Sequence, residues 1–213
     1  MSFKVKDGQT YLFQGDSITD AGRRGADFPF GSGYAKMFID KVVANHPERN
    51  ITFINRGIGG HTVVDLQNRW EDDAINVKPD WLSIMIGVND LHRSILGRPD
   101  PIGPERYREA YDDILSRTLK AGKCGTVLIE PFYISRDMSG SSHRTTVLNM
   151  IPDYIAVVRE MAKKHGALLV NTHDIFQEHL KYRDPNHFCP EPVHPNPAGH
   201  AVIAEALYRT LCD

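Results

Sequence analysis

A serine and a histidine that lie far apart in the chain are the residue types whose combination could perform nucleophilic catalysis. Ser17 lies in Gly15-Asp16-Ser17-Ile18, directly after the apolar stretch Tyr11-Leu12-Phe13, so its hydroxyl is expected at the carboxyl end of a strand. A serine hydroxyl attacks a carbonyl carbon only when a base removes its proton. His194 is the candidate base, because two prolines bracket it on a stiff loop before the last predicted helix. The alternative for Gly-Asp-Ser alone is a simple turn or helix cap.

Two further polar segments follow predicted strands. They are Asn55-Arg56-Gly57-Ile58-Gly59-Gly60 and Gly87-Val88-Asn89-Asp90. Taken singly, each is typical of an ordinary turn between a strand and a helix, the second with an Asx cap. Serine, glycine, asparagine and histidine nevertheless follow in this order, each at the end of a predicted strand or before a helix. This order predicts one site assembled from four distant segments.

The four segments resemble the four sequence blocks of the SGNH (GDSL-type) hydrolases, and the resemblance covers nearly the whole chain. It implies that Ser17 is the nucleophile and His194 the general base. It also implies an oxyanion hole formed by the backbone N–H groups of Ser17 and Gly60 and the side-chain amide of Asn89. These choices are physically reasonable, because a glycine lets the backbone approach the substrate and an amide is an uncharged donor to the developing oxyanion.

The segment before the base departs from the family pattern. The family has an aspartate three residues before the histidine, whereas this chain has Glu191. Glutamate orients the histidine in some α/β-hydrolases, so we expect Glu191 to do so here; Asp184, or a serine–histidine dyad held by a backbone carbonyl, is the alternative. Related esterases have an aromatic residue where this chain has Pro190, so this loop is expected to recognise a different acyl group or alcohol. Asp16 and Asn55 are expected to support the site through hydrogen bonds to loop backbone.

Further stretches narrow the resemblance to bacterial intracellular esterases related to acetyl xylan esterases; among them are Arg69-Trp70-Glu71-Asp72-Asp73 and Lys78-Pro79-Asp80-Trp81. The implied activity is that of a serine esterase that hydrolyses small acetyl esters, such as acetylated xylo-oligosaccharides, through a Ser-His-acid triad and an acyl-enzyme. The alternatives are a lipase, thioesterase or arylesterase with the same site, or a catalytically decayed carbohydrate-binding protein. The resemblance also implies a homodimer or higher homo-oligomer.

The elements that must position these residues alternate along the chain. Short apolar runs predict strands at 10–14, 51–55, 81–86, 125–130 and 167–171, and amphipathic runs predict helices at about 33–46, 62–76, 104–121, 144–165, 173–182 and 196–211. This alternation predicts an α/β protein with a three-layer α/β/α, flavodoxin-like SGNH hydrolase fold and a five-stranded parallel sheet in the order 2-1-3-4-5. Residues 1–213 are expected to form a single domain, with loops 22–33 and 98–104 close to the site.

Composition restricts the possible partners. Of 213 residues, 41% are hydrophobic and 24% charged, and a net charge of −2 argues against nucleic-acid and anionic-membrane surfaces. No apolar stretch is long enough to span a membrane and no signal peptide is visible, so a cytoplasmic protein is expected. Cys124, Cys189 and Cys212 form no CxxC pair, which favours reduced thiols. Cys189 with His187 and His194 matches no standard zinc spacing, so neither metal nor cofactor is expected.

Overall fold

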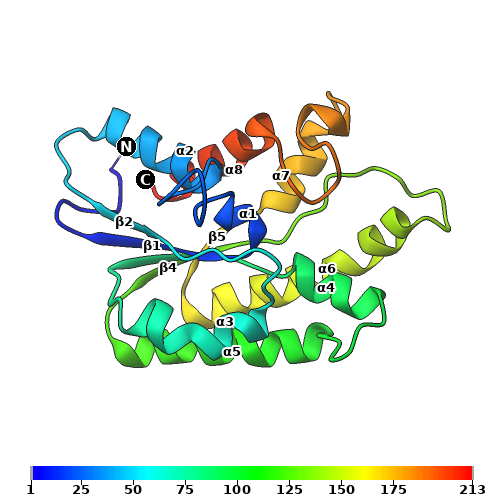
Figure 1. Ribbon diagram of the computed structural model, residues 1–213, viewed down its shortest axis with the longest axis horizontal. Helices are drawn as coiled ribbons and strands as arrows, with labels where there is room; N and C mark the ends of the chain where they lie inside the picture. The colour runs from blue at the N-terminus through cyan, green and yellow to red at the C-terminus, as the bar shows by residue number, and fades with distance from the viewer. Residues whose placement is uncertain (1, 213) are drawn as a thin grey trace.

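Five parallel strands form the centre of the molecule in the computed structural model, which describes residues 2–212. They are β1 (Thr10–Gly15), β2 (Thr52–Asn55), β3 (Trp81–Met85), β4 (Gly125–Ile129) and β5 (Leu168–Val170). Their order in the sheet is β2-β1-β3-β4-β5, as Figure 1 shows. The predicted strand order is therefore confirmed, and each end of each strand lies within one residue of its predicted position.

Helices cover both faces of the sheet (Figure 1). One face carries α1 (Ser17–Asp20), α2 (Tyr34–Asn45), α7 (Thr172–His179) and α8 (Pro197–Thr210), with α2 packed against α8. The other face carries α3 (Val63–Trp70), α4 (Val88–Ile95), α5 (Pro104–Ala121) and α6 (His143–His165), with α5 packed against both α3 and α6. The predicted three-layer α/β/α fold is confirmed.

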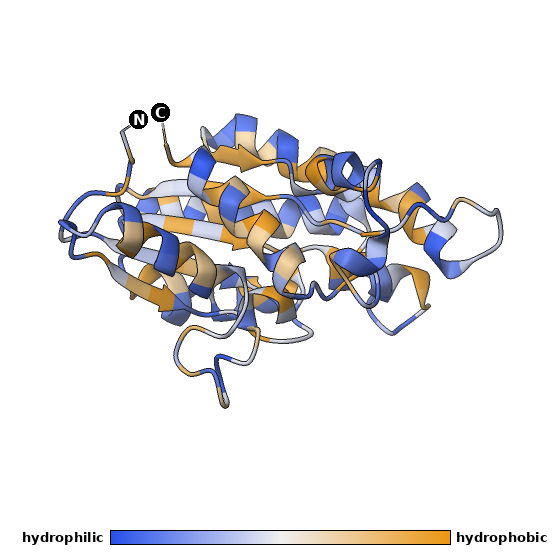
Figure 2. Cartoon of the chain, turned by 90° about the horizontal axis from the view of Figure 1, so that it is seen from above, coloured by the Kyte–Doolittle hydropathy of each residue, from blue (hydrophilic) through white to orange (hydrophobic). Residues whose placement is uncertain are grey.

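The core lies on both sides of the sheet, which explains why the central strands have continuous apolar sequences. Leu12 and Phe13 in β1 are fully buried although they point to opposite faces. The Phe13 ring packs against Tyr11 and Phe38 at centroid distances of 4.8 and 5.7 Å. Figure 2 shows hydrophobic strands at the centre, and helices in which hydrophobic and hydrophilic residues alternate. Among the described residues, no helix combines the length and apolarity needed to cross a membrane.

Two local features differ in detail from the predictions. The predicted helix at 62–76 is confirmed as α3, but its second part, Glu71–Ile75, is a π-helical turn rather than α-helix. No helix was predicted directly after β3, where the structure has α4, an eight-residue helix. Its sequence is mostly polar and short, so its stability comes from packing against α6, where Tyr154 donates a hydrogen bond to Ser94 at 3.2 Å. A short 3-10 turn, Pro185–His187, precedes the His194 loop.

Candidate active site

A tight turn between β1 and α1 places Ser17 at the carboxyl edge of the sheet. Asp16 caps α1, because its carboxylate accepts a hydrogen bond from the Ile18 N–H at 3.0 Å. The turn needs a glycine at position 15, since an added Cβ would lie 2.3 Å from the Thr19 hydroxyl oxygen. β1 and β3 are neighbours whose connections leave in opposite directions, so Ser17 lies at the point where ligands bind in such sheets.

Ser17, His194 and Glu191 are in direct contact. The Ser17 hydroxyl oxygen lies 2.9 Å from His194 Nε2, and His194 Nδ1 lies 2.5 Å from Glu191 Oε1. With its proton on Nδ1, the imidazole donates to the carboxylate and leaves Nε2 as the acceptor for the serine proton. This arrangement has the geometry of a nucleophile, a general base and an orienting acid. The His194 side chain is 58% exposed, so the constellation is open to solvent and to substrate.

The Glu191 side chain folds back over its own loop. Its two carboxylate oxygens accept hydrogen bonds from the backbone N–H groups of Val193 at 3.0 Å and His194 at 2.8 Å. Partial burial by itself would raise the pKa of Glu191, but these hydrogen bonds and the contact with His194 lower it below its ordinary value. Asp184 instead caps the 3-10 turn by accepting from the Asn186 N–H at 2.9 Å. Of the two acids considered from the sequence, Glu191 is therefore the one in contact with His194.

The His194 loop is held at both ends. On its C-terminal side, the Asn196 side chain caps α8 by accepting from the Ala198 and Gly199 N–H groups at 2.9 and 3.1 Å. On its N-terminal side, the Ile134 N–H donates to the Pro192 carbonyl at 2.9 Å. Because these hydrogen bonds fix the backbone, the positions of Glu191 and His194 follow from the loop conformation.

Asn55 joins three segments around Ser17. Its carbonyl oxygen accepts from the Gly57 N–H at 2.9 Å, while its NH₂ group donates to the Thr19 carbonyl at 2.7 Å and the Phe30 carbonyl at 2.8 Å. The glycine-rich loop, α1 and the 22–33 loop are thus connected by one buried side chain. Gly57 is closely packed there, since an added Cβ would lie 2.4 Å from the Asp20 nitrogen.

Of the three expected oxyanion donors, Gly60 and Asn89 are connected by a hydrogen bond between their segments. Gly60 has a φ of +80°, which favours glycine, and its N–H makes no hydrogen bond within residues 2–212. Ser17 opens α1, so its N–H has no partner within that helix. One amide hydrogen of Asn89 is donated to the His61 carbonyl at 2.9 Å, one residue beyond Gly60. The other remains available for a substrate oxygen.

Two carboxyl groups next to the expected site residues in the sequence, Asp16 and Asp90, are buried. Burial raises the pKa of Asp16 and that of Asp90 to about 7. Asp90 accepts from the Val63 N–H at 2.9 Å, while its second carboxyl oxygen is buried without a hydrogen-bond partner among the described residues. Each group accepts a hydrogen bond from a backbone N–H in the first turn of a helix, Asp16 from Ile18 in α1 and Asp90 from Val63 in α3.

A cavity of about 250 Å³ opens beside Ser17. Its lining consists of short or polar residues: Ser17, Asp20, Ala21, Gly22, Arg24, Gly25 and Gly59. Arg24 Nε donates to Asp20 Oδ2 at 2.8 Å, and the Gly59 N–H donates to the same oxygen at 3.1 Å. The sequence analysis placed the 22–33 loop close to the site, but it assigned no role to Asp20 or Arg24. The i,i+4 spacing of an acid and an arginine directly after the serine segment was the available signal.

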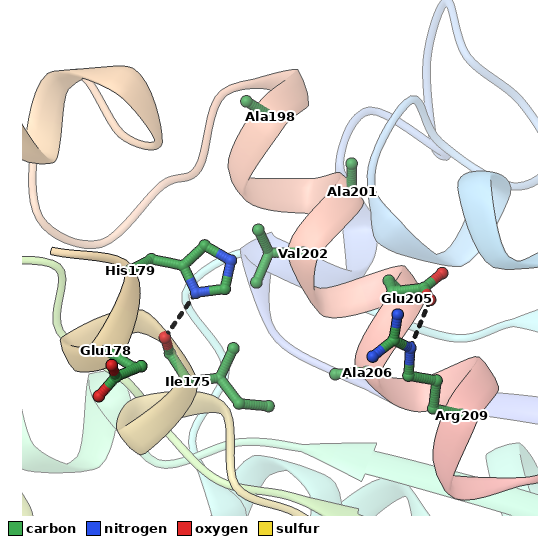
Figure 3. Close-up of a pocket in the computed structure, with 9 residues that line it drawn as sticks. All are labelled: Ile175, Glu178, His179, Ala198, Ala201, Val202, Glu205, Ala206 and Arg209. Atoms are coloured by element: carbon green, nitrogen blue, oxygen red, sulfur yellow. Dashed lines mark hydrogen bonds and ion pairs between the residues drawn. The ribbon is translucent and has the colours of Figure 1, made fainter. Parts of the chain in front are cut away.

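A second cavity, of about 550 Å³, lies between α7 and α8 (Figure 3). Its wall is mostly apolar, and its polar side chains are paired within the protein: Arg209, for example, pairs with Glu205 at 2.6 Å. None of Ser17, Asn89 and His194 lines it. This cavity is therefore separate from the serine-centred site.

Cys189 and its neighbouring histidines do not gather around one point. Cys189 is buried and His187 is exposed. Burial raises the pKa of the Cys189 thiol to about 12. Within the part of the chain that the structure describes, no three His, Cys, Asp or Glu side chains are placed to hold a metal ion.

Comparisons with known proteins identify a family, a relative and solved structures that this chain resembles. Residues 13–202 match the model of the GDSL-like Lipase/Acylhydrolase family. The chain is 36% identical to an acetylxylan esterase from Geobacillus stearothermophilus over 216 residues, which covers 98% of this chain and 96% of that protein. A crystal structure of that esterase superposes with a TM-score of 0.88 and 36% identity, covering 99% of this chain and 97% of the other.

Further solved structures are similar to this chain over nearly its whole length. An alpha/beta hydrolase enzyme from the metagenome of Lake Arreo, Spain, has a TM-score of 0.88 and 32% identity, covering 99% of this chain and 98% of that one. Structures of the Geobacillus esterase include variants described as catalytic mutants, in which a serine, a histidine or an aspartate is replaced by alanine. These are the residue types that the family pattern assigns to the triad.

Proposed function

The chain belongs to the GDSL-like lipase/acylhydrolase family and is a carboxylic ester hydrolase, and we propose that it removes acetyl groups from carbohydrates, such as acetylated xylo-oligosaccharides, with Ser17 as nucleophile. The observation that carries the proposal is the contact series from Ser17 through His194 to Glu191, at 2.9 and 2.5 Å. The acetyl and carbohydrate assignments are supported by the similarity to the acetylxylan esterase over 98% of the chain.

In the first half of the proposed reaction, the Ser17 hydroxyl oxygen forms a bond to the acetyl carbonyl carbon while its proton passes to His194 Nε2. The protonated imidazole is stabilised by the Glu191 carboxylate, whose lowered pKa keeps it ionised at neutral pH. The bond from the carbonyl carbon to the alcohol oxygen then breaks, and His194 returns its proton to the leaving alcohol. The product of this half-reaction is an acetyl-enzyme on Ser17.

In the second half, a water molecule attacks the acetyl-enzyme and His194 again accepts and returns the proton. Acetate leaves and the Ser17 hydroxyl is restored. The negative oxygen formed in each half is stabilised by the N–H groups of Ser17 and Gly60 and by the Asn89 amide. Removing one such donor costs roughly 100- to 1,000-fold in rate in other serine hydrolases, so these groups are a substantial part of the proposed catalysis.

Hydrolysis of p-nitrophenyl acetate at neutral pH tests the proposal, with the parent compared to Ser17→Ala and His194→Ala. Each substitution is expected to lower kcat by at least about a thousandfold, the scale of triad members elsewhere. Ser32→Ala is the matched control, because Ser32 is exposed and its hydroxyl only donates to the Ala21 carbonyl at 3.2 Å. Activity of either triad variant within tenfold of the parent would contradict the assignment.

Acyl specificity separates the proposal from the related activities. Activity that falls from p-nitrophenyl acetate to longer acyl esters supports deacetylation, whereas activity that rises favours a lipase or thioesterase. Saturable sugar binding without turnover by the parent would favour a decayed, carbohydrate-binding protein instead.

The remaining expectations stay predictions. They are the single-domain organisation over residues 1–213, the cytoplasmic location and the assembly into a homodimer or higher homo-oligomer. Size-exclusion chromatography with light scattering measures the assembly directly.

A further inference from the structure

We propose that Arg24, held in place by Asp20, binds the alcohol part of the ester and selects a neutral, polyhydroxylated alcohol. This inference rests on the proposed function, because it assigns a substrate class to the same serine-centred site. It concerns the cavity beside Ser17, whose lining includes Arg24 but neither His194 nor Glu191.

Arg24 reaches close to the nucleophile. An ideal Cβ built on Gly59 would lie 3.8 Å from Arg24 Nη2 and 3.8 Å from Ser17 Cβ. These two atoms are therefore separated by at most twice that distance. A substrate whose ester bond lies at the Ser17 hydroxyl can place a neighbouring hydroxyl or ring oxygen against the guanidinium without leaving the cavity.

The guanidinium is oriented but retains free donors. Its Nε is occupied by Asp20 Oδ2 at 2.8 Å, and Asp20 is itself 6% exposed and fixed by the Gly59 N–H. Within residues 2–212, Nε is the one Arg24 nitrogen that makes a hydrogen bond, so the N–H groups of Nη1 and Nη2 are not used in one. A planar guanidinium held through one nitrogen presents its remaining N–H donors in a fixed direction, which reduces the entropy lost on binding.

The lining of the cavity favours the alcohol over the acyl group. Apart from the Ala21 methyl group, its wall has no hydrocarbon side chain that would stabilise a long acyl chain. Its volume of about 250 Å³ is equivalent to several water molecules, at roughly 30 Å³ each in the liquid. An acetyl group leaves most of this space unfilled, whereas a sugar ring with several hydroxyls fills it and supplies acceptors for Arg24.

At the Arg24 guanidinium itself, the ion pair with Asp20 favours a neutral ligand over an anion. The other positive charges of this region are supplied by Arg23, Arg56 and Arg69. Asp20 forms an ion pair with Arg24 and offsets its positive charge at short range. A carboxylate or phosphate on the substrate would therefore approach both a guanidinium and a buried carboxylate. Hydroxyl and ring oxygens can accept from the Nη groups without this repulsion, which is the reason for assigning a neutral sugar.

The experiment compares two acetyl esters that differ only in their alcohol: a monoacetylated methyl xyloside and p-nitrophenyl acetate. For Arg24→Gln, the ratio of kcat/KM for the xyloside to kcat/KM for the aryl ester is expected to fall about 10- to 100-fold, the value of a hydrogen bond to a charged group. Arg24→Lys, which keeps the charge but loses the planar pair of Nη donors, is expected to lower the same ratio by a smaller factor.

Arg209→Gln is the matched control, because Arg209 also forms an i,i+4 ion pair through Nε, with Glu205 at 2.6 Å, on the exposed surface of α8. For Arg209→Gln, the ratio of kcat/KM for the xyloside to kcat/KM for the aryl ester is expected to stay within about twofold of the parent value. Exposed ion pairs of this kind contribute little to stability, and this one lies outside the cavity beside Ser17. Thermal unfolding of all three variants shows whether each is folded under the assay conditions.

The outcomes are distinct. If the parent hydrolyses neither ester, the proposed function fails. If Arg24→Gln lowers both rates by the same factor, Arg24 only maintains the loop and the inference is overturned. If it instead changes the preference between p-nitrophenyl acetate and p-nitrophenyl butyrate, the cavity holds the acyl group, and the inference is also overturned.

Discussion

Asp90 accepts a hydrogen bond from the backbone N–H of Val63 at 2.9 Å, so the first turn of α4 holds the first turn of α3. Its neighbour Asn89 donates to the His61 carbonyl at 2.9 Å. Two consecutive side chains of α4 therefore fix the segment that directly follows Gly60. The expected oxyanion donors Gly60 and Asn89 consequently belong to one connected unit, although they are far apart in the sequence.

The Asn89 amide is expected to contribute directly to catalysis. Asn89→Ala removes both the hydrogen bond to His61 and the remaining donor, so kcat for p-nitrophenyl acetate should fall about 100- to 1,000-fold. Asn76→Ala, the same substitution at an exposed position, should leave kcat within about twofold. An unchanged kcat for Asn89→Ala would remove Asn89 from the oxyanion hole.

Glu191 is expected to be required as a carboxylate. In Glu191→Gln the amide has no charge to stabilise the imidazolium, and its NH₂ group favours the wrong histidine tautomer; we expect kcat to fall by about 100-fold or more. The same change at the alternative acid, Asp184→Asn, keeps the cap on Asn186 and should change kcat by less than about threefold. A loss below tenfold for Glu191→Gln, or a larger loss for Asp184→Asn, would favour Asp184 or a dyad.

Two glycines of one loop should respond differently to alanine. In Gly57→Ala the new methyl group would lie 2.4 Å from the Asp20 nitrogen and 2.7 Å from the Thr19 carbonyl carbon, so α1 and Ser17 must shift. In Gly60→Ala the new methyl group would have no neighbouring heavy atom within 4 Å. Its cost comes from the positive φ, which destabilises a residue with a Cβ by roughly 1–2 kcal/mol. We therefore expect Gly57→Ala to lose more stability in urea unfolding. A larger loss for Gly60→Ala would contradict this packing.

Stability should decrease as the pH rises toward neutrality. The pKa of Asp90 is raised by burial from 3.8 to about 7, so between these values the folded protein binds a proton that the unfolded chain has released. The free energy of unfolding then falls with pH, by up to ~1.4 kcal/mol per pH unit for one such group, and levels off above about pH 7. Asp16 contributes in the same direction, because burial also raises its pKa to about 7.

Asp90→Asn removes one of these titrating groups and keeps a carbonyl oxygen for the Val63 N–H. The free energy of unfolding of the variant minus that of the parent should therefore increase as the pH rises from about 5 to about 8. Urea unfolding at each pH measures this difference. If the difference between the two proteins does not change with pH, Asp90 does not titrate in this range.

Long elements with clear end signals were predictable from the sequence. The helix expected at 104–121 is α5, Pro104–Ala121, because Pro104 is favoured in the first turn and Gly122 ends the helical pattern. α4 was missed because a short polar segment after Gly87 has the composition of a turn, and its helical state depends on packing against α6. The i,i+4 spacing of Asp20 and Arg24 was visible in the sequence, but the hydrogen bond from the Gly59 N–H to Asp20, which places this pair beside Ser17, depends on the fold.

The fold class, the strand order and the four segments of the site were predictable from the alternation of elements and from the family resemblance. Parallel strands place their carboxyl ends at one edge of the sheet, so the segments that follow these strands meet there. The acid that contacts His194 could not be chosen from the sequence and is defined by the folded loop. Glu191 and Asp184 have similar chemistry and lie on the same loop, and the difference arises from the loop backbone, which directs the N–H groups of Val193 and His194 at Glu191 and that of Asn186 at Asp184. Spacing along the chain does not specify such directions, because they depend on the backbone dihedral angles that packing imposes.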